Sequence, residues 1–319
     1  MNILVTIAVF IIVLLLYIYI TSQFKKSEDL DIYEMDYVSN KNLQDICDVR
    51  QPVVFYLASF DPSIFEPESI LSTSGPLDVK IKDLNDYYIS ETSVDSVSLP
   101  LNSAQKLLAN DASAHFLSEN NDDFLEESGL KKRIQNIDDF VKPPFSVHSK
   151  YDLIMGSPSA VTPLRYHTSY RHFLAVTSGK IRVKMTPWKS TKYLYPIRDF
   201  ENYEFYSPVH PVNTQSVYEK EFEKVRFLDF EVLPGYVLYI PPFWWYSIQF
   251  IDSAMVYSVS YVTVMNFSAN LPQSVLYWLQ QQNIRKKVSK PVLQKEPVIS
   301  DDPIVETETK EVEDAVVET

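Results

Sequence analysis

The chain has 319 residues, a 45% hydrophobic share and a formal charge of −13, which suits a large folded domain with a substantial core. The negative charge argues against nucleic acid as a partner, because binding phosphates needs clustered lysine and arginine. Only 5 glycines stand against 20 prolines, and neither a GxGxxG fingerprint nor a P-loop occurs. A single cysteine, Cys47, excludes an intramolecular disulfide and a cysteine-based zinc cluster.

The N-terminal residues 3–20 form an almost uninterrupted apolar run. As a helix this run would be about 27 Å long, close to the hydrocarbon thickness of a bilayer, so residues 1–22 are predicted to be a single transmembrane anchor. No basic residue precedes the run and no small-residue cleavage motif ends it, which favours an anchor over a signal peptide. Lys25 and Lys26 follow directly, and they predict a single-pass membrane protein whose C-terminal domain faces the cytosol.

The rest of the chain divides by composition into three parts. Residues 23–50 are polar and are predicted to be a juxtamembrane connector with a short helix near 42–49. Residues 51–283 are predicted to be the folded domain, and its helices are expected at 103–110, 121–137 and 271–283. Residues 284–319 are predicted to be a disordered tail, because 296–319 carry nine acidic residues against one lysine and no aromatic residue.

The folded domain is rich in short runs of β-branched and aromatic residues separated by turn residues. Such runs at close spacing predict a β-sandwich or barrel. Strands are expected at 52–57, 151–155, 173–176, 180–185, 227–232, 236–240, 245–250 and 255–264. Residues 177–180 are predicted to form a tight hairpin, and 187–224 an irregular insertion over the surface or the barrel mouth.

Residues 233–250 combine a turn at Pro234-Gly235, a short buried strand, a rigid Pro241-Pro242 bend and a second strand that begins with Trp244-Trp245. With other short motifs, this stretch resembles the Jumonji-type cupin family over roughly residues 52–264. The other motifs are Gly156-Ser157, Thr162-Pro163-Leu164, Phe173-Leu174, Gly179-Lys180 and Ser207-Pro208-Val209. The resemblance implies a mainly β fold, a cupin (double-stranded β-helix, or jelly-roll) barrel with flanking helices.

Members of that family bind Fe(II) through a His-x-Asp/Glu pair and a distal histidine, and use 2-oxoglutarate. The resemblance places Arg165, His167 and Tyr246 at these three positions. No histidine in the chain is followed two residues later by Asp or Glu, and none occurs after His210. A guanidinium stays protonated and repels a dication, so the three positions are predicted to be vestigial, with no metal and no catalytic residue.

Two further hypotheses concern the same pocket. Thr162, Arg165 and Lys180 are candidates for a small-anion or co-substrate pocket, because the family's 2-oxoglutarate lysine falls on Ile181 or, with a one-residue gap, on Lys180. The alternative is that Arg165 pairs internally with Tyr246 and fills the site. His167 and His172 are expected on opposite faces of a strand, which disfavours a two-histidine metal site.

The sequence therefore predicts a membrane-anchored, catalytically inactive Jumonji-like cupin that serves as a binding or scaffold module without a cofactor. The alternative is an Fe(II)- and 2-oxoglutarate-dependent protein hydroxylase or demethylase with unconventional ligands, His167, Tyr246 and His172. A third reading is a structural membrane protein with no pocket. The bilayer is the predicted partner of the N-terminal helix, a protein partner and a homodimer stay open, and nucleic acid is excluded.

Overall fold

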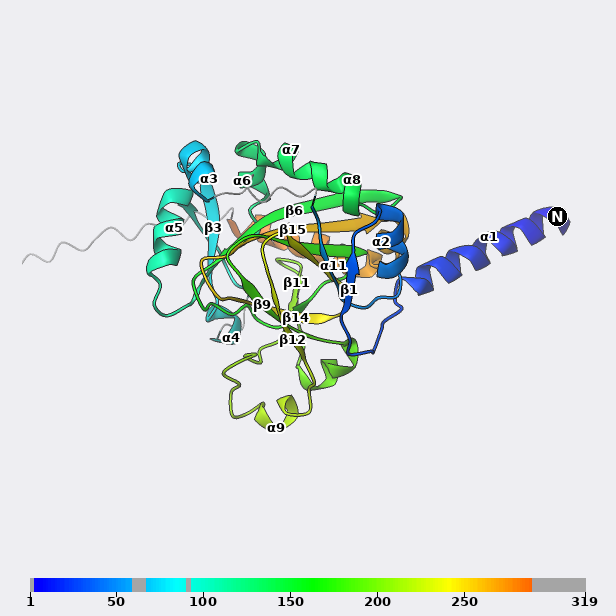
Figure 1. Ribbon diagram of the computed structural model, residues 1–319. Helices are drawn as coiled ribbons and strands as arrows, with labels where there is room; N and C mark the ends of the chain where they lie inside the picture. The colour runs from blue at the N-terminus through cyan, green and yellow to red at the C-terminus, as the bar shows by residue number, and fades with distance from the viewer. Residues whose placement is uncertain (1–2, 59–66, 90–92, 289–319) are drawn as a thin grey trace, which may run out of the picture.

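Two β-sheets form the body of the protein in the computed structural model (Figure 1). The structure describes residues 3–58, 67–89 and 93–288. The larger sheet has nine strands in the order β1-β2-β13-β8-β15-β6-β5-β3-β4, and the smaller has six in the order β10-β11-β7-β14-β9-β12. The fold is mainly β, as the sequence predicted.

The central strands pass back and forth between the two sheets, with β9 and β12 as the one consecutive pair in the same sheet, which is the arrangement of a double-stranded β-helix. The larger sheet takes β6 (Ser146–Gly156), β8 (Arg171–Ser178), β13 (Tyr236–Ile240) and β15 (Met255–Thr263). The smaller takes β7 (Arg165–Tyr166), β9 (Ile181–Thr186), β12 (Leu228–Val232) and β14 (Trp245–Phe250). The cupin barrel predicted from the resemblance is confirmed.

The hairpin predicted at 177–180 is wrong, because β8 and β9 lie in different sheets and do not pair. Strand β9 pairs instead with β12 and β14. Gly179 turns the chain between the sheets with a φ of +66°, and a Cβ there would lie 2.7 Å from the Cα of Ala254. Glycine is therefore required at this corner.

Several strands outside the central eight extend both sheets. Those of the larger sheet are β1 (Tyr33–Asp36), β2 (Val53–Tyr56), β3 (Asp78–Asp83), β4 (Val97–Pro100) and β5 (Phe116–Ser118). Those of the smaller sheet are β10 (Ile197–Asp199) and β11 (Glu204–Tyr206). The irregular insertion predicted at 187–224 is thus partly regular, since it supplies β10 and β11 together with η3 (Trp188–Tyr193) and α9 (Glu219–Phe222).

The segment predicted to be a connector, 23–50, is built into the fold instead. Strand β1 pairs in parallel with β2. Helix α2 (Asn40–Cys47) is capped by Ser39, whose side chain accepts a hydrogen bond from the Asn42 N–H. Leu43 and Cys47 on this helix are fully buried in the core. The segment is polar in overall composition, so its few buried apolar positions could not be recognised from composition alone.

Further helices surround the sheets, and Figure 1 places α6, α7 and α8 along β6. They are α3 (Pro67–Ser74), α4 (Asp86–Ile89), α5 (Leu101–Asn110), α6 (Asp122–Glu127), α7 (Leu130–Ile134), η2 (Gln135–Ile137), α8 (Asp138–Val141), α10 (Val264–Ala269) and α11 (Leu271–Val288). The helix predicted at 121–137 is interrupted at Gly129, which has a φ of +72°. Helix α11 continues into the region predicted to be a tail, and residues 289–319 lie outside the described part of the chain.

Helix α1 (Ile3–Ser22) adjoins the body only at the C-terminal end of the helix, and the rest of it projects away (Figure 1). None of its side chains is buried in the protein, and its mean hydropathy is 3.1 over an 18-residue window. Among the described residues it is the one helix long and apolar enough to cross a bilayer, although a signal sequence would meet the same criterion.

The buried position of α2 gives a first prediction. Replacing Leu43 with Ala should lower the free energy of unfolding by roughly 2–5 kcal/mol, because it leaves a cavity in the core. Urea denaturation of the full chain in detergent micelles measures this. Val49 is 53% exposed just beyond the helix, and Val49→Ala should change the free energy by about 0.5 kcal/mol or less. Equal effects of the two substitutions would contradict the placement of α2.

Candidate functional site

A cavity of about 140 Å³ lies inside the barrel and is lined by residues of both sheets. Arg165 on β7 pairs in register with Tyr246 on β14. The guanidinium carbon of Arg165 lies 5.5 Å from the centroid of the Tyr246 ring. His167 and His172 line the same cavity. The structure therefore brings together the three residues that the resemblance assigned to the metal positions.

The main partner of Arg165 is a carboxylate that the sequence did not suggest. Arg165 Nη1 donates a hydrogen bond to Glu119 Oε2 over 2.6 Å. Glu119 follows β5 directly and its side chain is only 4% exposed, against 16% for Arg165. The attraction within such a buried ion pair offsets the free energy of removing both charges from water only when their remaining polar atoms also form hydrogen bonds.

A second cation and a second carboxylate complete this network. Lys82 on β3 has a side chain that is 4% exposed, and its Nζ donates to Glu119 Oε1 over 3.2 Å and also to Glu204 Oε1. The hydroxyl of Tyr87 on α4 donates to Glu204 Oε2 over 2.7 Å. Arg165 and Lys82 together balance the charges of Glu119 and Glu204, so the network is formally neutral.

The electrostatics follow from burial and pairing. Burial alone would raise the pKa of the Glu119 carboxyl, but the charges of Arg165 and Lys82 outweigh it and hold that pKa down to about 2. Burial alone would lower the pKa of Arg165, but Glu119 raises it well above its usual value. Burial raises the pKa of the Tyr246 hydroxyl, so Tyr246 is a neutral phenol at physiological pH.

The expectation that His167 and His172 lie on opposite faces is wrong. Strand β7 ends at Tyr166, so His167 lies in the turn that leads to β8, and the alternation of a strand does not apply to it. The two imidazole rings lie 4.7 Å apart between centroids. His167 Nε2 bonds to the carbonyl of Ile240 over 3.0 Å, and His172 Nδ1 bonds to Ser260 Oγ over 2.6 Å.

Both imidazoles are neutral in the folded protein. Burial lowers the pKa of His167 to about 4 and lowers the pKa of His172 well below its usual value, with His167 and Arg165 adding to the effect. Among the described residues, Arg165 Nε and His172 Nε2 are buried without a hydrogen-bond partner. Arg165 and His172 therefore line the cavity while each keeps one polar atom that no described group of the protein satisfies.

The other two residues of the predicted anion pocket lie elsewhere. Thr162 is fully buried, and its Oγ1 accepts a hydrogen bond from the Ile248 N–H on β14 over 2.9 Å. Lys180 is exposed at the corner between β8 and β9. Ile181 is packed in the core. Neither Thr162 nor Lys180 lines the cavity with Arg165.

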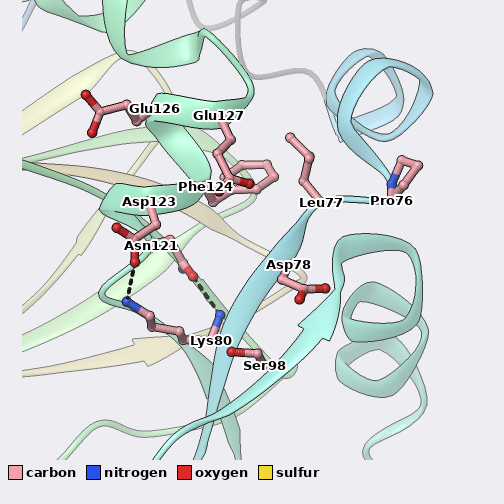
Figure 2. A pocket seen from close by; sticks show the side chains of 10 residues that line it. All are labelled: Pro76, Leu77, Asp78, Lys80, Ser98, Asn121, Asp123, Phe124, Glu126 and Glu127. Carbon is pink, nitrogen blue, oxygen red and sulfur yellow. Dashed lines mark hydrogen bonds and ion pairs between the residues drawn. The ribbon is translucent and has the colours of Figure 1, made fainter.

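A second hollow, of about 550 Å³, lies outside the barrel between β3, β4 and α6. Figure 2 shows its acidic side chains with Lys80, whose Nζ bonds to Asp123 and whose backbone N–H bonds to Asn121 Oδ1. Neither Arg165 nor any histidine lines this hollow. Within the described part of the chain, no three His, Cys, Asp or Glu side chains gather closely enough to hold a metal ion.

Comparison with known proteins places the fold in a family. The model of the cupin-like domain matches residues 80–281, more than half of the chain. A 105-residue segment is 30% identical to HSPB1-associated protein 1 from Bos taurus and 29% identical to the proteins of that name from Rattus norvegicus and Homo sapiens. The segment is 33% of this chain and 22% of each relative, so the match spans about a fifth of their length.

The ion-pair network gives a second prediction. Glu119→Gln should lower the free energy of unfolding by roughly 3–5 kcal/mol, because it leaves Arg165 buried without a counter-charge. Asp123→Asn is the matched control: Asp123 pairs with Lys80, but its side chain is 74% exposed, so the loss should be at most about 1 kcal/mol. Urea denaturation compares the two variants, and similar losses would mean that the buried network contributes no more than a surface pair.

The neutral histidine at 167 gives a third prediction, on pH dependence. Its pKa is about 4 in the folded protein against 6.5 ordinarily, so between these values the unfolded chain binds a proton that the folded chain does not. Stability should therefore fall as the pH drops through this window, by at most on the order of 3 kcal/mol. Denaturation of His167→Asn from pH 7 to pH 4 should show a shallower fall. The same substitution at exposed His148 should leave the slope in place, and identical slopes for all three proteins would contradict the prediction.

Proposed function

This chain belongs to the Jumonji-like family of cupin-like domains, and we propose that it is a membrane-anchored member whose metal site has been replaced by an internal ion-pair network. It acts as a non-catalytic binding or scaffold module. The observation that carries this proposal is the 2.6 Å bond between Arg165 and Glu119 inside the barrel.

The donors around the cavity do not fit the iron site of the family. That site needs two neutral imidazoles and one free carboxylate on one face of the metal. The carboxylate beside Arg165 is Glu119, and both of its oxygens are already bonded to cations. A guanidinium at about 4 Å repels each unit of positive charge by about 4 kcal/mol at an effective dielectric constant of about 20. Arg165 therefore opposes a dication in the position that the resemblance assigns to the metal.

What remains is a shaped pocket on a tethered domain. Arg165 lines the 140 Å³ cavity with a side chain that is 16% exposed, and this guanidinium is the proposed site for a small anion, with His172 beside it in place of Thr162 and Lys180. Helix α1 anchors the chain in a membrane, and Lys25 and Lys26 direct the domain to the cytosol. The relatives are named for an association with HSPB1, which supports binding to a protein as the role of this domain as well.

A second candidate function is favoured by one observation. The rings of His167 and His172 lie 4.7 Å apart, and Tyr246 lies 6.4 Å from His167 between ring centroids. These three side chains are the unconventional ligands of an alternative Fe(II)- and 2-oxoglutarate-dependent protein hydroxylase or demethylase. In that case Arg165 would have to stay with Glu119 while the metal binds on the histidine side.

The fourth prediction separates the two functions. The full chain, purified with Fe(II) present, should hold far less than one iron per chain and should consume 2-oxoglutarate no faster than heat-denatured protein. Metal analysis and a succinate assay measure this. One iron per chain with turnover that His167→Ala abolishes and His148→Ala spares would overturn the proposal and establish the oxygenase.

A further inference from the structure

We propose that the junction of α10 and α11 is a membrane-contacting surface, with the side chains of Val264, Phe267 and Leu271 inserted among the lipid headgroups. This inference rests on the anchoring role proposed for α1. It adds a second contact with the bilayer, made by the folded domain itself, and so fixes the orientation of the barrel on the membrane.

The first step is that α1 is joined to the barrel without a free linker. Phe24 lies against Phe243, with 6.4 Å between ring centroids. The Lys26 ammonium lies 4.0 Å from the centroid of the Trp188 ring and 4.7 Å from that of Phe243, a cation–π arrangement. Lys189 Nζ donates to the Glu28 carbonyl over 2.8 Å. The residues directly after the anchor are therefore held on the barrel surface.

The second step is that α1 contacts α10. Figure 1 shows that only the C-terminal end of α1 adjoins the body, so this contact lies where the apolar helix would emerge from the bilayer. The headgroup region on each side of a bilayer is roughly 5–8 Å thick. Helix α10 is thus within reach of that region.

The third step is that α10 and the start of α11 show an apolar face to solvent at this place. Their inner side is fixed to the barrel, because Asn266 and Asn270 both donate to the Thr168 carbonyl. The outer side carries Val264, Phe267 and Leu271, which are 46%, 50% and 48% exposed. Val264 and Phe267 lie three residues apart on one face of α10, and Leu271 begins α11 directly after Asn270. Exposed apolar side chains therefore lie on both sides of the junction, as on a helix at a membrane surface.

The bilayer is the occupant that these contacts favour. Exposed apolar residues also follow on α11, at Val275, Leu276, Tyr277, Trp278 and Leu279, so a second copy of the chain is the competing occupant. A second copy does not account for the direct contact of α10 with the anchor, whereas a bilayer around α1 must lie beside α10. The contacts of Phe24 and Lys26 with the barrel surface hold the domain next to the anchor, so the domain cannot move away from the bilayer.

The test uses fluorescent labels on the full chain in phosphatidylcholine vesicles. The variants Phe267→Cys and Leu271→Cys, each labelled with the dye NBD, report on the surface. Val217→Cys, at a site that is 82% exposed and next to α9, is the matched control, since Figure 1 shows α9 away from α1. The native Cys47 does not react, because it is fully buried and burial raises the pKa of its thiol to about 12.

Lipids with a doxyl quencher near the headgroup should reduce the NBD emission at 267 and 271 by about twofold or more and leave the emission at 217 nearly unchanged. Extraction with carbonate checks the anchor separately. If carbonate releases the chain, the anchoring role fails and this inference fails with it. If the chain stays in the membrane but 267 and 271 are no more quenched than 217, the inference alone is overturned. Disulfide-linked Leu271→Cys dimers without quenching would overturn it in favour of a second copy.

Discussion

The ion pair between Arg165 and Glu119 is the interaction on which the interior of this barrel depends. Arg165 belongs to the smaller sheet, while Glu119 follows a strand of the larger sheet and binds Lys82 from a third strand. The pair therefore joins the two sheets across the cavity. Its members are buried, so each charge is tolerated only because the others neutralise it. Removing one member would leave the remaining charges buried without a partner, which destabilises the fold.

This interaction determines what the pocket can do. The resemblance assigns two of the metal positions to Arg165 and Tyr246, and these residues pair in register on β7 and β14. The cavity is lined by the charged groups of Arg165, Glu119 and Glu204, whose charges are balanced within the protein. The proposed role is accordingly recognition by shape and polar contacts, carried out close to a membrane by a domain that Phe24 and Lys26 hold against its anchor.

The barrel could be predicted from the sequence because its strands carry local signals. Runs such as Tyr236–Ile240 combine β-prone residues with flanking turns, and the Pro-Gly and Pro-Pro motifs mark the corner. The partners of Arg165 could not be predicted in this way: Glu119 lies 46 residues away and Glu204 lies 122 residues from Lys82, and a single charged residue in a strand does not identify its partner. His167 was misplaced because the strand was expected to continue through it, whereas β7 ends at Tyr166.

The central claim, that an ion pair stands where the family holds iron, is tested most directly by crystallography of this protein soaked with Mn(II) and 2-oxoglutarate, with diffraction measured at the manganese absorption edge. The account predicts no anomalous peak in the cavity and an Arg165–Glu119 hydrogen bond that stays in place. An anomalous peak within coordination distance of His167 and Tyr246 would contradict it, whether or not Arg165 stays bonded to Glu119.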